Sequence, residues 1–313
     1  MTAERATADP ATPVRSGSPQ AWAAATRPRS LPVAISPVLV GATLGFGRTG
    51  AIDLVATLLV LGAALLMQII TNLQNDVGYT ARGGDSSGTR TGLPRATSNG
   101  WLSVRHVRAA IVVAALVAFG LGLALVAYRG WPVLAIGAAS LLAALAYMGG
   151  PKPIAYTPFG ELTVFVFFGL VAVMGTDWVL TGSIGPVSAI AAAALGSLAA
   201  AALAANNHRD IAHDRLIGRR TFSVSFGEGA SGALYATLLL GPFALVPIMA
   251  LVAQAPMLLL PLLLVPAALR LRRDFTRCPP GVAYNEILFR TFRLELWFAA
   301  LLSAGALLAR TLG

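Results

Sequence analysis

Charged residues are scarce in this sequence: they make up 12% of 313 positions, whereas 56% of the residues are hydrophobic. A soluble domain usually carries about 25% charged residues to cover its surface. The hydrophobic residues also lie in long blocks, several of which reach the roughly 20 residues that a helix needs to cross a bilayer. The composition therefore excludes an ordinary soluble domain and predicts an all-α integral membrane protein.

Cysteine is nearly absent as well, since Cys278 is the one cysteine of the chain. A single cysteine cannot form an intramolecular disulfide, so nothing indicates an oxidising compartment. The first 20 residues lack the basic start and short apolar core of a secretory signal. We expect residues 1–25 to form a disordered cytoplasmic tail and residues 26–313 to form one transmembrane domain.

The apolar blocks predict nine membrane-spanning segments. The eighth contains Pro256, Pro261 and Pro266, so we expect it to be kinked or irregular. The nine segments cover residues 30–47, 52–76, 107–127, 131–149, 159–181, 186–209, 230–253, 255–271 and 289–312.

The distribution of positive charge agrees with this number of segments. If the N-terminus is cytoplasmic, 20 of the 23 Lys and Arg residues fall on the cytoplasmic side, and only Arg48, Arg129 and Arg310 fall on the other. Cytoplasmic loops carry such an excess, so we expect a multi-pass protein of the inner (cytoplasmic) membrane with its N-terminus in the cytoplasm. Membrane orientation and an anionic substrate explain the net charge of +10, and we expect no nucleic-acid partner.

Acidic and amide residues gather at two predicted helix ends, both on the cytoplasmic side. At the first end, Asn72, Asn75 and Asp76 are spaced i, i+3 and i+4, so that they share one helical face. Asp85 follows a Gly-Gly pair that can return the chain toward them. The alternative interpretation is a helix cap followed by a polar loop.

At the second end, Asn207, Asp210 and Asp214 are spaced i, i+3 and i+7, and Asn206 lies beside them. An ionised carboxylate in an apolar core costs about 2.5–3.5 kcal/mol on insertion scales, so such residues usually line a cavity or pathway. A surface ion pair with a neighbouring arginine would explain one Asp, but not two polar faces that open on the same side.

Two facing sets of carboxylates can bind a diphosphate through Mg²⁺, which is typically held by one or two carboxylates together with substrate phosphates. Cations must balance the remaining phosphate charge, for which Arg is suited to bidentate contact and Lys to a point charge. The positive-inside bias alone would also place basic residues here. Those predicted on this side are Arg82, Arg95, Lys152, Arg209, Arg215, Arg219 and Arg220.

A tight turn rich in Gly and Pro leads into the fifth segment. Tyr147 precedes the turn, Lys152 lies within it and Glu161 lies near the start of the following helix. These three residues can line the same cavity. The alternative is that Glu161 is simply placed where the helix dipole favours an acid.

Taken together, the two polar helix ends resemble the UbiA-type intramembrane prenyltransferases, and the resemblance covers about residues 26–312. Within this family the similarity is greatest to the menaquinone branch, the 1,4-dihydroxy-2-naphthoate polyprenyltransferases. The pairing that carries it is Asn72-x-x-Asn75-Asp76 with Asn207-x-x-Asp210-x-x-x-Asp214-Arg215. Four further stretches contribute: Arg27-Pro-Arg29-Ser-Leu-Pro32, Arg90-Thr-Gly92-Leu-Pro94-Arg95, Gly149-Gly150-Pro151 through Gly160-Glu161-Leu162, and Asn206-Asn207 through Gly218-Arg219-Arg220-Thr221.

The resemblance implies about nine helices around a central cavity and Mg²⁺ as cofactor. It implies transfer of a polyprenyl group from its diphosphate to an aromatic acceptor, 1,4-dihydroxy-2-naphthoate in menaquinone biosynthesis, within membrane lipid. Asp76, Asp210 and Asp214 would be catalytic, and with Asn72 they would bind the metal. The substrate-binding residues would be Asn72, Asn75, Asp85, Arg95, Tyr147, Lys152, Arg209 and Arg215.

Tyr79 departs from the family pattern, because the first motif of this branch usually has a further Asp there. The metal site is one carboxylate short unless Asp85 or a water takes that place. Two other functions stay open: prenylation of 4-hydroxybenzoate or another phenolic acceptor, and a transporter in which the Asn/Asp clusters form an ion path. Clusters at helix ends on one side favour an enzyme over a transporter, whose broken helices meet near the midplane.

Overall fold

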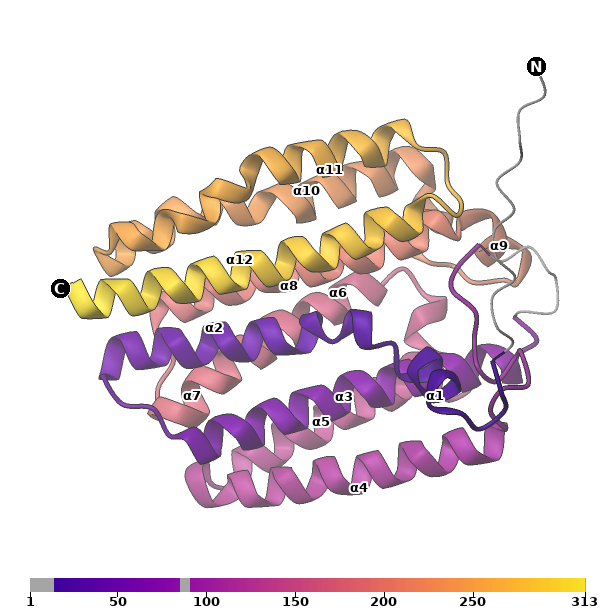
Figure 1. The fold of residues 1–313 in the computed structure, drawn as a ribbon, viewed down its shortest axis with the longest axis horizontal. Helices are drawn as coiled ribbons and strands as arrows, with labels where there is room; N and C mark the ends of the chain where they lie inside the picture. The colour runs from indigo at the N-terminus through magenta and orange to yellow at the C-terminus, as the bar shows by residue number, and fades with distance from the viewer. Residues whose placement is uncertain (1–13, 85–90, 313) are drawn as a thin grey trace.

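The computed structural model describes residues 14–84 and 91–312, which form helices joined by loops (Figure 1). The predicted all-α class is confirmed. Asp85, one of the predicted substrate-binding residues, lies outside the described residues. The elements are α1 (Pro19–Thr26), η1 (Pro28–Ser30), α2 (Pro32–Thr49), α3 (Leu54–Ala81), α4 (Val104–Arg129), α5 (Trp131–Met148), η2 (Ile154–Tyr156), α6 (Gly160–Val164), η3 (Phe165–Met174), α7 (Gly175–Thr181), α8 (Pro186–Arg209), α9 (Ile211–Leu216), α10 (Phe222–Ala253), η4 (Pro256–Leu264), α11 (Val265–Arg277) and α12 (Tyr284–Leu312).

Seven helices of the described chain are long and apolar enough to cross a membrane. They are α3, α4, α5, the continuous helix formed by α6, η3 and α7, and then α8, α10 and α12. The pair Pro19–Ser30 and Pro32–Thr49, bent by 45°, makes an eighth if it is one span. The protein is therefore a multi-pass membrane protein, whereas the predicted number of nine spans is not confirmed.

The eighth predicted segment matches none of these spans, and its prolines explain why. Pro256 and Pro261 lie in η4, which is a 3₁₀ helix, and Pro266 stands in the first turn of α11. Proline has no backbone N–H to donate, so three closely spaced prolines remove several of the hydrogen bonds that a regular α-helix would need here. The prediction of an irregular segment is confirmed.

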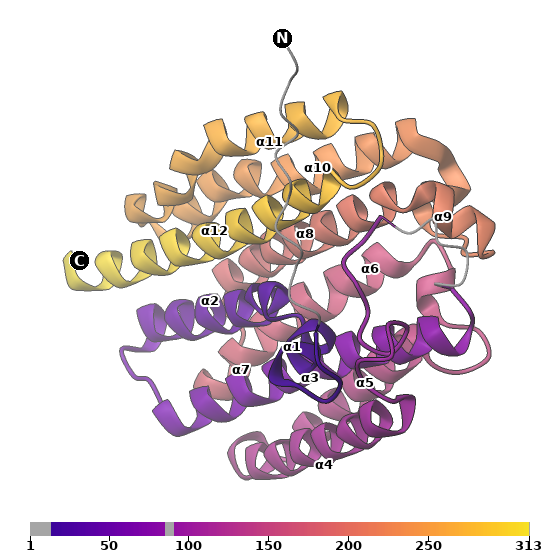
Figure 2. The same ribbon diagram turned by 45° about the vertical axis from the view of Figure 1, so that its right-hand side comes forward.

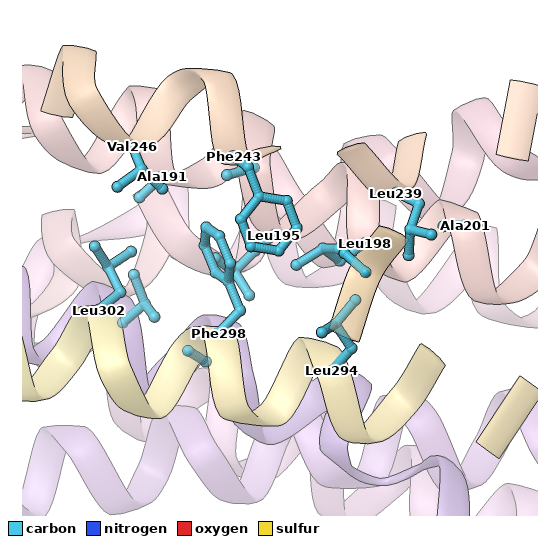
Figure 3. Packing of buried hydrophobic residues seen from close by; sticks show 14 of the residues in the cluster. Ala191, Leu195, Leu198, Ala201, Leu239, Phe243, Val246, Leu294, Phe298 and Leu302 are labelled. Atoms are coloured by element: carbon cyan, nitrogen blue, oxygen red, sulfur yellow. The ribbon is translucent and has the colours of Figure 1, made fainter. Parts of the chain in front are cut away.

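The long helices lie side by side with roughly parallel axes, and the short helices α1 and α9 gather with several loops at one end of the bundle (Figures 1 and 2). Helix α8 runs through the interior, with 67% of its apolar stretch buried. Figure 3 shows Leu195 of α8 beside Phe243 of α10 and Phe298 of α12, with Leu198 further along α8 and nearer Leu294 of α12. The second polar helix end lies at the C-terminus of α8. The packing of this core therefore fixes its position.

Small residues allow η3 and α8 to approach closely. A Cβ atom added to Gly169 would lie 2.5 Å from the Cα of Gly196 and 2.5 Å from the carbonyl oxygen of Ala192. Helices in membranes associate through such contacts, because apolar side chains gain little there from leaving lipid. The helix that begins at Gly160 is thereby held against the helix that ends at Arg209.

The ordered part of the chain begins earlier in the sequence than predicted. Residues 1–13 lie outside the described residues, but residues 19–25 of the predicted disordered tail form most of α1. Ser18 caps this helix, and Ala21 and Ala25 are fully buried. They pack in a cluster with Ile70 and Leu73 of α3. Helix α1 therefore belongs to the domain and covers the end of α3 that carries the first polar motif.

Candidate active site

A cavity of about 660 Å³ runs along the bundle between α2, α3, α4, α5, η3 and α8. Its polar end is formed near the C-terminal ends of α3 and α8, and most of its length is apolar. The polar lining includes Arg27, Arg29, Ser30, Gln68, Thr71, Asn72, Asn75, Tyr147, Asn206 and Arg209. The apolar lining includes Val60, Ala63, Phe119, Leu125, Val133, Ile136, Leu141, Phe167, Phe168 and Val171.

The first motif divides its side chains between the cavity and the neighbouring loops. Asn72 and Asn75 both line the cavity, as their shared helical face predicts. The Asn72 amide donates to the carbonyl oxygen of Thr26 at 2.8 Å and to Ser30 Oγ at 2.9 Å. Asn72 therefore joins α3 to the chain that enters α2, at the mouth of the cavity.

Asp76 is fully buried and anchors the loop that follows α3. Its carboxylate accepts hydrogen bonds from the backbone N–H of Ala96 at 2.9 Å and of Thr97 at 2.8 Å, and from the Thr97 hydroxyl. Hydrogen bonds to an ionised acceptor are about twice as strong as neutral ones. Asp76 thus fixes the loop around residues 96–97. Its side chain does not line the cavity, although we expected Asp76 to be catalytic and to bind the metal.

In the second motif, Asp210 forms a bidentate pair with Arg209. The two Asp210 oxygens lie 2.9 Å from Arg209 Nε and 2.5 Å from Arg209 Nη2. The same guanidinium donates to Asn206 Oδ1 at 2.9 Å and to Asn285 Oδ1 at 2.7 Å. Arg209 lines the cavity, so this network presents a positive charge at the polar end while Asp210 holds it in place.

Tyr79 links the two motifs. Arg95 lies over its ring, 3.3 Å from the centroid, and Arg219 lies 5.0 Å from the same centroid and donates to its hydroxyl. Arg219 also pairs with buried Asp214 at 2.7 Å. Burial lowers the pKa of Arg219 to about 9, and the guanidinium stays protonated at neutral pH beside Asp214. At the position where a further carboxylate was expected, the ring of Tyr79 therefore packs against two arginines, Arg95 and Arg219.

Glu161 and Asn207 form a buried pair beside this network. The Asn207 amide donates to Glu161 Oε1 at 2.8 Å, and each residue is at most 5% exposed. The pair joins the start of α6 to the end of α8. Tyr147, which precedes the intervening turn, lines the cavity as predicted.

The residues at this end are chemically suited to Mg²⁺, because carboxylate and amide oxygens are the hard ligands that this ion takes. Each predicted carboxylate ligand also accepts from a protein donor: Asp76 from the 96–97 backbone, Asp210 from Arg209 and Asp214 from Arg219. Within residues 14–84 and 91–312, no three His, Cys, Asp or Glu side chains come together in a group that could hold a metal ion. The predicted metal ligands therefore flank the cavity end without forming one cluster.

The family model of the UbiA prenyltransferase family matches residues 34–290. The chain belongs to the UbiA prenyltransferase family. It is 35% identical to the 1,4-dihydroxy-2-naphthoate octaprenyltransferase of Escherichia coli over 71% of this chain and 73% of that one. The enzyme of the same name from Mycobacterium leprae is 33% identical over 91% of this chain and 95% of its own.

Solved structures of the UbiA family share this fold. A UbiA homologue from Archaeoglobus fulgidus bound to DMAPP and Mg²⁺ superposes with a TM-score of 0.66, covering 93% of this chain and 99% of that one at 15% identity. An apo UbiA homologue from Aeropyrum pernix also gives a TM-score of 0.66, over 89% of this chain at 17% identity. These likenesses confirm the predicted UbiA-like architecture.

Some predicted site residues of this UbiA-family chain lie apart from the cavity. Lys152 and Arg215 are exposed on the surface and do not line it, and Arg95 is buried against Tyr79. Arg82 donates to the carbonyl oxygens of Met148 and Gly150. Sequence reasoning missed Arg27 and Gln68 as cavity residues, although Arg27 lies in one of the stretches that carry the family resemblance.

Proposed function

We propose that this protein transfers a polyprenyl group from its diphosphate to 1,4-dihydroxy-2-naphthoate in menaquinone synthesis. The observation that carries the proposal is one cavity with a cationic, amide-rich end and a long apolar remainder. That combination suits a substrate with a diphosphate head and a hydrocarbon tail. Relatives that are 33–35% identical bear the name 1,4-dihydroxy-2-naphthoate octaprenyltransferase, which supports the same acceptor.

In this proposal the polar end binds the diphosphate. Arg209 and Arg27 line the cavity and supply positive charge to phosphate oxygens. Asn72, Asp76, Asp210 and Asp214 would hold Mg²⁺, which when bound neutralises the charge that develops on the leaving diphosphate. Donors placed where charge develops in the transition state are usually the largest electrostatic contribution to catalysis.

The apolar remainder would hold the prenyl chain and keep water from the reacting carbon. Two of its lining residues, Phe119 on α4 and Ile136 on α5, are 45% and 40% exposed on the surface of the bundle. We propose that the cavity opens sideways between α4 and α5, toward the lipid. A chain longer than the cavity can extend through this opening into the bilayer.

An assay of the purified protein in liposomes tests the proposed activity. With a polyprenyl diphosphate, Mg²⁺ and 1,4-dihydroxy-2-naphthoate, we expect a prenylated naphthoquinol, CO₂ and inorganic diphosphate, and EDTA should stop the formation of all three. If product forms only with 4-hydroxybenzoate, the proposed acceptor is wrong and the proposed prenyl transfer still holds. Uptake of a solute without any prenylated product would exclude an enzyme.

The chain length of the prenyl substrate should depend on Gly122 of α4. Gly122 lines the cavity, and a Cβ atom placed there would meet nothing within 4 Å. We expect Gly122→Leu to fill part of the lateral opening and to shift the preference in kcat/KM from long toward short prenyl diphosphates, by about tenfold. One or two methylene-sized changes in an apolar pocket typically alter discrimination by roughly 10–200-fold.

Gly120→Leu is the matched control on the same helix. Gly120 has equally open surroundings but does not line the cavity, so its variant should keep the wild-type preference. Competition between two prenyl diphosphates of different length, followed by chromatography of the products, measures the effect. Equal preferences in the two leucine variants would contradict the proposed path of the chain.

We also propose an inner-membrane location with the N-terminus in the cytoplasm. The support is the 20-to-3 distribution of Lys and Arg between the two sides under the nine-segment arrangement. This orientation puts the polar end of the cavity on the cytoplasmic side, where water-soluble substrates and Mg²⁺ are available.

A further inference from the structure

Glu161 stands one helical turn before the cavity-lining face of its helix. Val164, Phe168 and Val171 line the cavity, and Glu161 precedes Val164 by three residues. Residues three apart in an α-helix lie on the same face. Glu161 itself is buried and does not line the cavity, but it lies one turn beyond the polar end of this lining stripe.

The Glu161 carboxylate has one oxygen without a hydrogen-bond donor among the described residues. Its Oε1 accepts from Asn207, while its buried Oε2 accepts from no described group. Asn207 Oδ1 is likewise buried without a donor in that part of the chain. A buried acceptor left unsatisfied is destabilising, and more so when it is charged. Both atoms would gain from a ligand that donates.

The surroundings connect this pair to the cavity. A methyl group added at Gly160 would lie 3.5 Å from the Tyr147 hydroxyl oxygen, so this hydroxyl lies beside the start of α6. Tyr147 lines the cavity, and so does Asn206, the neighbour of Asn207. The carboxylate is therefore one side-chain layer away from the cavity.

The two proposed substrates differ in what they can offer to such a site. A diphosphate has only acceptor oxygens and negative charge, so a carboxylate with a free oxygen repels it. A hydroxylated aromatic ring has O–H groups to donate. The acceptors at Glu161 and Asn207 thus match the aromatic substrate and not the prenyl diphosphate.

We propose that Glu161, oriented by Asn207, receives the proton of the hydroxyl group on the aromatic acceptor; the proposal rests on the function proposed above. As the ring carbon attacks the allylic carbon, the O–H bond breaks and its proton passes to Glu161 Oε2. The electron pair of that bond moves into the ring, the new C–C bond forms, and the allylic C–O bond breaks with its electron pair on the diphosphate. When the attacking carbon is the one that bears the carboxylate, CO₂ then leaves, the electrons of its C–C bond restore the aromatic ring, and Glu161 returns the proton to the ring oxygen. General bases of this kind contribute typically about 10²–10⁴-fold to rate.

The test is Glu161→Gln in the full-length protein in liposomes. Glutamine keeps an oxygen for the Asn207 amide and puts an NH₂ group where Oε2 stands, so the buried packing is preserved. We expect kcat to fall by about 10²-fold, with the KM for the prenyl diphosphate unchanged within about twofold. The loss should be smaller for acceptors with a more acidic hydroxyl, because they need less help in releasing the proton.

Glu286→Gln is the control, since Glu286 is exposed and pairs with Arg293 at the surface; it should keep wild-type kinetics. A Glu161→Gln enzyme with wild-type kcat would overturn the proposal. So would a variant in which the unfolding temperature and the KM for the prenyl diphosphate change together, because that result assigns Glu161 a structural role. A wild-type protein that prenylates no aromatic acceptor would instead refute the proposed function.

Discussion

Replacing Asp210 with Asn is expected to lower kcat for prenyl transfer by about a thousandfold, a loss of roughly 4 kcal/mol in transition-state stabilisation. The substitution removes the negative charge that holds Arg209 by two hydrogen bonds at the cavity. It also removes a proposed Mg²⁺ ligand. Asparagine keeps the shape of the side chain, but breaking this buried pair costs about 3–5 kcal/mol. Initial rates in liposomes at saturating substrates measure the effect, and the unfolding temperature is measured beside them.

Asp274→Asn is the matched control for Asp210→Asn. Asp274 also pairs with an arginine, Arg290, at 2.6 Å, but this pair lies partly exposed on the surface. Exposed ion pairs contribute about 0–1 kcal/mol to stability, so this variant should keep both its activity and its unfolding temperature. An Asp210→Asn enzyme that retains more than half of the wild-type kcat would exclude Asp210 from the catalytic site.

Replacing Asp76 with Ala is expected to abolish measurable activity and also to destabilise the fold. The buried carboxylate accepts from two backbone N–H groups and one hydroxyl of the 96–97 loop, and alanine leaves these donors unsatisfied. Removing one partner of a buried charged network costs about 3–5 kcal/mol. On the scale of soluble domains this corresponds to a fall of about 10 °C in unfolding temperature.

Asp53→Ala, at the other end of the same helix, is the control that distinguishes the loss of a helix cap from the loss of the loop anchor. Asp53 caps α3 by accepting from the Ala56 N–H at 2.9 Å, and losing such a cap costs about 1 kcal/mol. Its variant should keep activity and lose only a few degrees. In Asp76→Ala, the loop around residues 96–97 should become a site of limited proteolysis. A variant that keeps this loop protected would contradict the anchoring role.

The fold could largely be predicted, because apolar length and charge are properties of the chain itself. The predicted segments at 131–149 and 186–209 agree with α5 and α8 to within a residue. The end of α3 could not be found in this way, since the helix continues from the apolar block through polar residues to Ala81. What keeps those residues helical is burial against α1 and the 96–97 loop, which hydropathy does not report.

Residues of the candidate site could be predicted from the sequence, but the contacts that they make with one another could not. The i, i+3 spacing placed Asn72 and Asn75 together on the cavity wall. It could not show that Asp76 would turn to backbone N–H groups 20 residues further along the chain. Nor could it show that Tyr79 would lie between Arg95 and Arg219. Those contacts depend on how the loops fold over the helix ends, and loop geometry has no periodic signal in sequence.

The sideways opening proposed at Phe119 and Ile136 determines the units in which the kinetics must be expressed. A substrate that enters from the bilayer is counted per unit of membrane, so its half-saturating amount is a mole fraction in lipid. Doubling the lipid at constant substrate should therefore act as a twofold dilution, even though the molarity in the tube is the same. The supply of the chain-bearing substrate then becomes a matter of two-dimensional diffusion, while the aromatic partner still arrives in three dimensions.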